Sequence, residues 1–212
     1  MSATESLTEA EDFGRKYKEG KGLMGRMIDG YFTSVARLVA RIPQTELHSA
    51  LEIGCAEGFS TERLRSILNP NVKLEASEYV ERQVPLAQAR VPSVRVIQED
   101  IYHLQRPDAS IDLIFALEVM EHLDDVPAAL GELHRASRRY IMIGVPNEPL
   151  WRIMHFLAGK NIRDWGNTPG HVNHWSTKAL VKLLQHNNFR PIAVGTPTPW
   201  SIVLAEKIAS EE

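Results

Sequence analysis

The sequence predicts an α/β fold with a doubly wound, mostly parallel sheet of seven strands that ends in an antiparallel hairpin. Three observations carry this prediction. From about residue 50 to 146, apolar stretches of strand length alternate with amphipathic stretches of helical length. A glycine-rich turn follows the first apolar stretch. Two short strand-like runs around a proline-rich turn follow the last helical stretch.

The elements follow in chain order from these patterns. Five strands are predicted in the alternating part, at residues 50–54, 73–77, 94–98, 111–117 and 140–145. Helices are predicted at residues 60–67, 81–89, 126–136 and 177–187. The hairpin is predicted from strands at 191–195 and 201–206, with a turn at 196–199.

The length of 212 residues suits one domain with added segments. We expect residues 1–48 to form one or two helices that cover the ligand side, and residues 49–146 to form the binding core. Residues 147–176 hold no regular repeat and are too long for a simple connection, which predicts an inserted lid. Residues 177–212 supply the helix and hairpin that complete the core.

Composition narrows the class of protein. The formal net charge of −3 argues against a nucleic-acid partner, because such partners select a basic surface. Cys55 is the single cysteine, so no internal disulfide can form and a reducing cytoplasm is expected. The acidic N-terminal stretch does not resemble a signal peptide. No apolar run reaches the roughly 18 residues of a transmembrane helix.

The turn after the first strand is the most informative motif. It places Glu52, Gly54, Ala56 and Gly58 at alternate positions between a strand and a helix. Glycines let the backbone approach a ligand closely, and the helix N-terminus offers N–H groups to polar ligand atoms. Glu52 would repel a pyrophosphate, so the motif favours a cationic ligand over a dinucleotide.

Two further carboxylates end the next two strands. Glu78 is placed to accept hydrogen bonds from both hydroxyls of a ribose, and Asp100 to accept one from an adenine amino group. Tyr79, Ile101 and Leu117 flank these positions in the predicted site. A nucleoside with a cationic tail satisfies the whole set, and S-adenosylmethionine (SAM) carries both a sulfonium and an ammonium.

On these residues the chain resembles the class I SAM-dependent methyltransferases over roughly residues 45–206. The resemblance implies a Rossmann-like sheet and SAM at its carboxyl edge, with Glu52 and the glycine loop near the methionine moiety. Ala56 departs from the glycine usual at the middle loop position.

A second group follows the fourth strand. Glu118, Glu121 and His122 come within five residues, and His171 and His174 follow about 50 residues later. Such carboxylate and imidazole groups suit a divalent metal ion. The pattern is similar to ubiquinone-pathway O-methyltransferases and to small-RNA 2′-O-methyltransferases, which implies a metal at Glu118, Glu121, His122 and one later histidine. His174 is preferred over His171 because it directly precedes the last helix.

Other interpretations of this group stay open. His122 or His174 could act as a metal-free catalytic base, or the group could serve the scaffold alone.

In the predicted lid, Leu150, Ile153, Met154 and Leu157 have helical spacing, which favours a core helix. An apolar acceptor wall and a peripheral membrane-surface helix are the alternatives.

The sequence thus predicts a SAM-dependent methyltransferase that acts on a hydroxyl of a small, partly apolar metabolite. The alternatives are a metal-dependent RNA 2′-O-methyltransferase, an N-methyltransferase and a SAM-fold binding module without catalysis.

Overall fold

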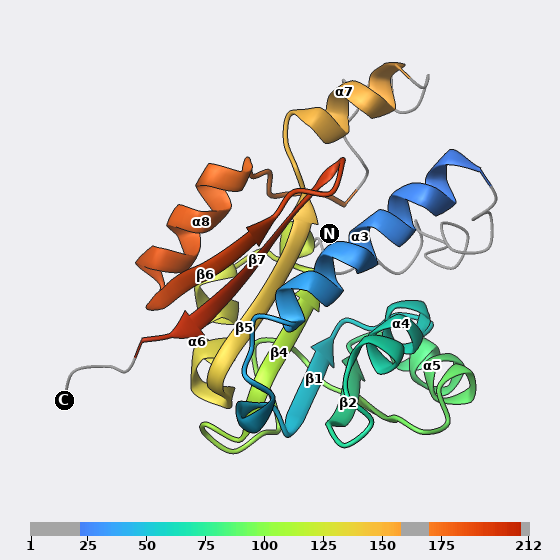
Figure 1. Cartoon of the computed structure of the whole chain (residues 1–212), viewed down its shortest axis with the longest axis vertical. Coiled ribbons are helices and arrows are strands. Elements are labelled where there is room, and N and C mark those ends of the chain that lie inside the picture. Colours follow the sequence, from blue (N-terminus) through green and yellow to red (C-terminus); the bar gives the residue numbers. More distant parts are fainter. Residues whose placement is uncertain (1–21, 158–169, 209–212) are drawn as a thin grey trace.

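The computed structural model describes residues 22–157 and 170–208 of the chain, and its centre is a seven-stranded sheet (Figure 1). The strands lie in the order β3-β2-β1-β4-β5-β7-β6. The first five are parallel, and β7 is antiparallel to both of its neighbours. Their bounds are β1 Ser49–Ile53, β2 Lys73–Glu78, β3 Arg95–Gln98, β4 Ile111–Leu117, β5 Ser137–Pro146, β6 Phe189–Gly195 and β7 Trp200–Lys207. The predicted mostly parallel sheet with its antiparallel hairpin is confirmed.

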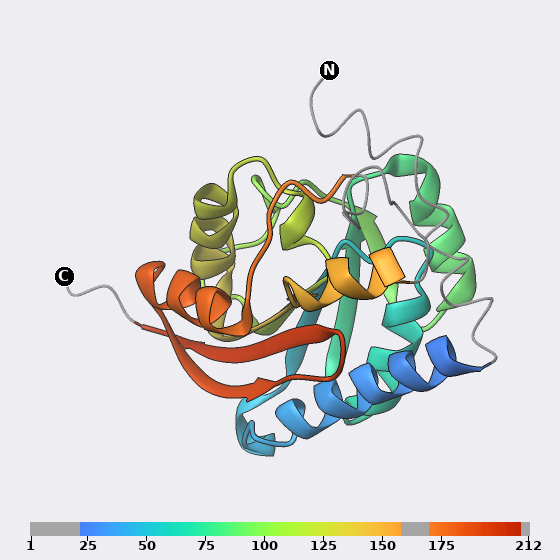
Figure 2. The same cartoon turned by 90° about the horizontal axis from the view of Figure 1, so that it is seen from above.

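Helices cover both faces of the sheet, as the view in Figure 2 shows from above. One apolar core contains side chains of α3 (Leu23–Val39), α4 (Phe59–Ile67) and α5 (Val84–Arg90). The other contains side chains of α6 (Val126–Ala136) and α8 (Thr177–His186). All seven residues of β4 are buried, because the strand is central and packs against both layers.

Local sequence sets the starts of α6 and α8. A side-chain oxygen of Asp125 accepts a hydrogen bond from the Ala128 backbone N–H (3.0 Å), which caps α6. Ser176 caps α8 in the same way by accepting from the Ala179 N–H. The predicted helix at 81–89 instead begins as a 3₁₀ turn, Glu81–Gln83, and α5 starts at Val84 with a proline in its first turn.

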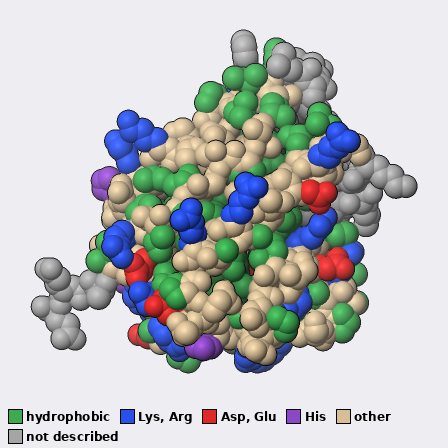
Figure 3. Space-filling model, in the orientation of Figure 1, with side chains coloured by type: hydrophobic (Ala, Val, Ile, Leu, Met, Phe, Trp, Pro, Cys, Tyr) green, Lys and Arg blue, Asp and Glu red, His purple; other side chains and the backbone are tan. Residues whose placement is uncertain are grey.

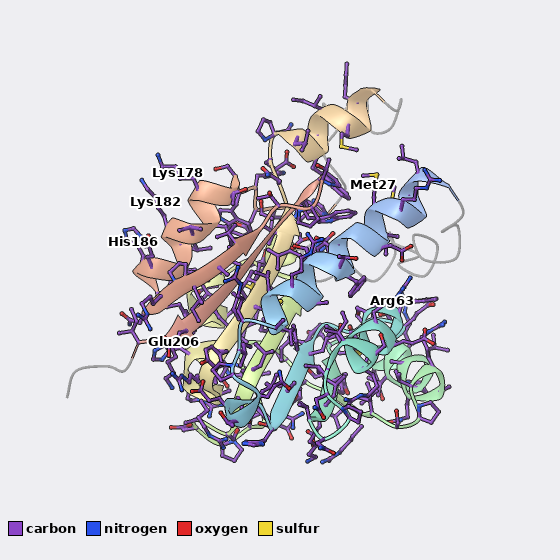
Figure 4. The ribbon with its side chains drawn as sticks, in the orientation of Figure 1. Met27, Arg63, Lys178, Lys182, His186 and Glu206 are labelled. Carbon is purple, nitrogen blue, oxygen red and sulfur yellow. The ribbon has the colours of Figure 1, made fainter. Side chains whose placement is uncertain are left out.

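Helix α3 is part of the hydrophobic core. Six of its side chains are buried, with Val35 wholly inaccessible to solvent. Arg63 of α4 forms an ion pair with Asp29 of α3 (2.9 Å), and Figure 4 labels Arg63 between the two helices. The remainder of the predicted N-terminal cover, residues 1–21, lies outside the described residues.

The predicted lid contains helix α7, Leu150–Leu157, which stands beyond the carboxyl edge of the parallel strands (Figure 1). The expectation that its leucine and isoleucine side chains belong to the core is wrong for Leu150 and Ile153, which are 37% and 50% exposed. Trp151 is buried in their place. Figure 3 shows hydrophobic side chains gathered over α7. Residues 158–169 of the predicted lid lie outside the described residues.

The described part of the chain contains no helix that is both long enough and apolar enough to cross a membrane. The direction of the strand crossovers reverses between β1 and β4, and ligands of open α/β sheets bind in the crevice at that point.

Candidate functional site

The loop after β1 has the backbone shape that its glycines predict. Gly54 and Gly58 have positive φ angles of 70° and 82°. A Cβ added to Gly54 would lie 2.7 Å from Val119 Cγ2, and one added to Gly58 would lie 3.1 Å from Ala87 Cα. Both positions therefore need glycine for conformation and for space. Val119 follows β4, so the first loop packs directly on the residues after the fourth strand.

Ala56, between the two glycines, also has a positive φ angle, 47°. This left-handed conformation explains why glycine is usual at the position, and an alanine there is strained. A carboxylate oxygen of Glu78 accepts a hydrogen bond from the Ala56 N–H (2.8 Å), and the other oxygen accepts from the Val80 N–H (2.8 Å). Glu78 thus holds the loop to the end of β2, a role that the sequence did not predict. Its predicted contact with a ribose stays a prediction.

Glu52 lies at the inner side of this loop and is 1% exposed. Its Oε2 atom and the buried Oγ1 of Thr61 make no hydrogen bond of ordinary geometry in the described part of the chain, but the hydroxyls of Ser60 and Thr61 lie near enough to the carboxyl to act against the rise of its pKa. Burial, with a smaller contribution from the negative charge of Glu78, raises the pKa of Glu52 to about 7. A buried acceptor of this kind fits a cationic ligand, because a positive charge would restore the ionised form.

Two adjacent acidic residues follow β3 and have different surroundings. Glu99 is buried and binds the Arg106 guanidinium (Nε–Oε1 3.0 Å), so it belongs to the scaffold. Asp100 is half-buried, and its Oδ1 accepts from the Tyr102 N–H (3.0 Å). Of the two, Asp100 is the carboxylate that is not engaged by an arginine and not fully buried, and its predicted contact with an adenine stays a prediction.

The three flanking residues occupy the same edge of the sheet. Tyr79 follows β2 with half of its side chain exposed, at 49%. Ile101 follows Asp100, and Leu117 ends β4; both are buried. The predicted cofactor residues thus lie at the carboxyl ends of neighbouring strands or just after them, the edge at which open parallel sheets bind ligands. Their contact with a cofactor stays a prediction.

Beyond β4, a short 3₁₀ turn, Met120–His122, carries the second group. Ligand atoms of Glu121, His122 and His171 all lie within 4.8 Å of one another. Backbone hydrogen bonds hold the two segments together, since the Glu121 carbonyl accepts from the N–H groups of Val172 (2.9 Å) and Asn173 (3.1 Å). The structure therefore joins residues that are about 50 positions apart.

The backbone orients one of these imidazoles. His122 Nδ1 lies 3.0 Å from the Gly170 carbonyl oxygen. Because a carbonyl can only accept, Nδ1 carries the proton, and the lone pair of the neutral ring is at Nε2. The His171 ring meets the His122 ring edge to face, with centroids 4.9 Å apart.

His174 and Glu118, which we expected in this group, lie outside it. The segment from His171 is extended, so alternate side chains point inward, and His171 is buried while His174 is exposed. Partial desolvation and the positive charge of Arg152 lower the pKa of His174. Glu118 directly follows β4 with a positive φ angle of 60°, and its N–H donates to the Gly144 carbonyl (2.8 Å). In the described part of the chain, the histidine that joins Glu121 and His122 is therefore His171 and not the preferred His174.

A family described as "Methyltransferase domain" matches residues 26–194. A probable S-adenosylmethionine-dependent methyltransferase of Mycobacterium tuberculosis is 29% identical over 154 residues, 72% of this chain and 52% of that protein. A trans-aconitate 2-methyltransferase of an Azoarcus species is 32% identical over 133 residues, 60% of this chain and 52% of that protein. The chain spans about half the length of these relatives.

Among solved structures, magnesium protoporphyrin IX methyltransferase from Synechocystis, with bound SAH, superposes with a TM-score of 0.69. The match covers 92% of this chain and 95% of that one at 15% sequence identity. At that identity the likeness concerns the fold.

Proposed function

The chain belongs to the class I SAM-dependent methyltransferases, and we propose that it transfers the methyl group of SAM to a hydroxyl of a small, partly apolar metabolite. One observation carries the proposal. The buried Glu52 lies near the end of β1, directly before the glycine loop, and Glu121 and His122 follow the adjacent parallel strand β4, where His171 from the segment before α8 joins them. A methyl donor at the glycine loop would face an acceptor at the group after β4.

Methyl transfer requires that the acceptor oxygen be positioned against the methyl carbon and that the acceptor hydroxyl lose its proton. The acceptor oxygen attacks the methyl carbon, the carbon–sulfur bond breaks with its electron pair going to sulfur, and SAH leaves. The hydroxyl proton passes to a base, and we assign that role to Nε2 of His122. Its Nδ1–H at the Gly170 carbonyl supports this assignment, because it leaves Nε2 as the basic nitrogen.

The size and polarity of the acceptor follow from the surroundings. Val172, beside His171 in the chain, is half-exposed, and α7, whose Trp151 stacks on His171, presents Phe156 to solvent. These exposed apolar side chains, on segments that adjoin the imidazoles in the chain or contact them, support a partly apolar acceptor. A relative named for trans-aconitate supports a small-molecule acceptor. The overall charge of −3 argues against an RNA acceptor.

As the alternative to a metal-free base, we propose that Glu121, His122 and His171 hold a divalent metal ion, in which case Nε2 of His122 is a ligand and does not accept the proton. One carboxylate and two imidazoles form a three-residue ligand set that leaves positions for an acceptor, and the Gly170 carbonyl orients His122 as expected of a metal ligand. Bound there, the ion would lower the pKa of the acceptor hydroxyl. Native mass spectrometry after addition of Zn²⁺ or Mn²⁺ tests it: wild type and His174→Ala should bind one ion, and His171→Ala none. Equal binding by both variants would refute the site.

The methyltransferase activity is tested with methyl-labelled SAM. The protein is incubated with fractionated cell extracts, and labelled products are identified by mass. We expect a label on an oxygen of a small molecule, and loss of the label with His122→Ala. Labelled RNA or labelled amine nitrogen would overturn the proposed acceptor. Equal labelling by the His122→Ala protein would overturn the base.

A further inference from the structure

A column of aromatic rings connects the N-terminal helix to the imidazoles of the site. Tyr31 of α3 contacts Trp200 of β7, with ring centroids 5.2 Å apart. Trp200 contacts Trp151 of α7 at 5.7 Å, and Trp151 stacks on His171 at 6.2 Å with 28° between the ring planes. His171 then meets His122. Apart from His122, no ring in the column is more than 7% exposed.

Trp151 is the point at which α7 enters this column. It is the one buried side chain among the described side chains of α7, whereas Leu150, Ile153 and Phe156 are exposed. Backbone hydrogen bonds from Asn147 N–H to the Pro199 carbonyl (2.8 Å) and from Glu148 N–H to the Trp175 carbonyl (2.9 Å) fix where the chain enters α7. Within α7, the indole of Trp151 is the ring that contacts the imidazole of His171.

The other end of the column, at Tyr31, is closely packed against the sheet. Tyr31 packs over Gly144, where an added Cβ would overlap the Tyr31 hydroxyl. The Gly144 carbonyl accepts from the N–H of Glu118, the first residue after β4. Trp200 thus contacts Tyr31 as well as Trp151, so the side of Trp151 that faces Trp200 is closely packed.

We propose that Trp151 is a positioning residue, which fixes the His171 ring against His122 and so sets the direction of the imidazoles toward the acceptor. This inference rests on the proposed function, because the acceptor chemistry is what the imidazoles serve. Aromatic contacts of this spacing favour particular relative orientations of the rings. A chain of them restricts ring orientation more than an aliphatic contact of equal size would.

The first test needs no acceptor. The ring resonances of His122 and His171 are recorded by NMR in wild type, Trp151→Leu, Trp151→Phe and the matched control Ile153→Ala, which trims the exposed face of the same helix. Trp151→Leu should shift and broaden the resonances of both histidines, Trp151→Phe should leave His122 close to wild type, and Ile153→Ala should change neither. Unchanged His122 resonances in Trp151→Leu would overturn the proposal.

The second test separates positioning from folding and from the proposed function. With an acceptor in hand, Trp151→Leu should lower kcat by about tenfold to a hundredfold, because small misplacements cost that much. The KM for SAM should stay unchanged, and Trp151→Phe should recover most of the rate. If Trp151→Phe and Ile153→Ala lost as much kcat as Trp151→Leu, the assignment of Trp151 as a positioning residue would be overturned. If wild type transfers no methyl group to any acceptor, the proposed function fails, and the NMR result still decides the positioning.

Discussion

At the scale of single residues, Glu52 combines a carboxyl group, deep burial and a neighbouring glycine loop. Because its pKa is raised to about 7, a large part of the free protein carries Glu52 in the neutral form near neutral pH. Only the ionised form attracts the charges of SAM. If Glu52 contacts SAM, as we predict, the affinity for SAM is coupled to the protonation of this one side chain.

We predict that SAM affinity rises with pH between about 6 and 8 and that Glu52→Gln removes this dependence. Titration calorimetry at several pH values measures it. Glu62→Gln, on the exposed side of α4, is the matched control and should keep the wild-type slope. A Glu52→Gln protein with the wild-type pH slope would show that another group titrates.

The same residue predicts how stability depends on pH. The unfolded chain loses the Glu52 proton near 4.5, whereas the folded protein keeps it to about pH 7, so folding takes up a proton in this window. The contribution of Glu52 to the free energy of unfolding therefore falls as pH rises from about 4.5 to 7, by up to about 3 kcal/mol. Urea unfolding should show a smaller fall for Glu52→Gln.

Ala56 is a second residue of interest, because its backbone conformation lowers the free energy of unfolding. Its φ angle of 47° favours glycine, so Ala56→Gly should raise the free energy of unfolding by about 1 kcal/mol. Ala109, with a φ angle of 48°, offers a matched control in a loop away from the predicted cofactor site. Ala109→Gly should stabilise by a similar amount and leave SAM affinity as it is. Thermal unfolding measures both variants. A lower Tm for Ala56→Gly would contradict the argument that the positive φ angle of Ala56 destabilises the loop.

At the scale of elements, the contact of α3 with β5 depends on the absence of a side chain at Gly144. We predict that Gly144→Ala destabilises by about 1–3 kcal/mol, because the new methyl group displaces Tyr31 of α3. Gly131 on α6 has open space around its Cβ position, and Gly131→Ala should stabilise by about 0.5–1 kcal/mol. Chemical denaturation of both variants checks the opposite signs, and equal signs would contradict the argument.

At the scale of the whole molecule, α3 and the sheet share one apolar core, which predicts a single cooperative unit rather than a core with a detachable cover. Leu38 of α3 is 5% exposed in that core, so Leu38→Ala should cost about 2–5 kcal/mol. Leu38→Ala should lower the midpoint of a single unfolding transition, and circular dichroism and tryptophan fluorescence should give the same midpoint. A separate early transition in this variant would show that α3 unfolds independently.

The sequence by itself determined the sheet, its hairpin and the glycine loop. Strands and helices follow from local periodicity, and the end of α6 falls where its pattern ends, at Ala136. Gly54, Gly58 and Asp100 were predicted as exposed to a ligand by position alone, because the carboxyl ends of parallel strands always meet at one edge.

Only the tertiary structure decided which side chains meet. Whether His171 or His174 joins His122 depends on the direction of an extended segment, and a shift of one residue would reverse it. Trp151, the buried residue of α7, faces rings from β7 and from the segment before α8, which no local pattern relates. Periodicity reports how a segment folds on itself, whereas a site is made of contacts between segments far apart in the chain.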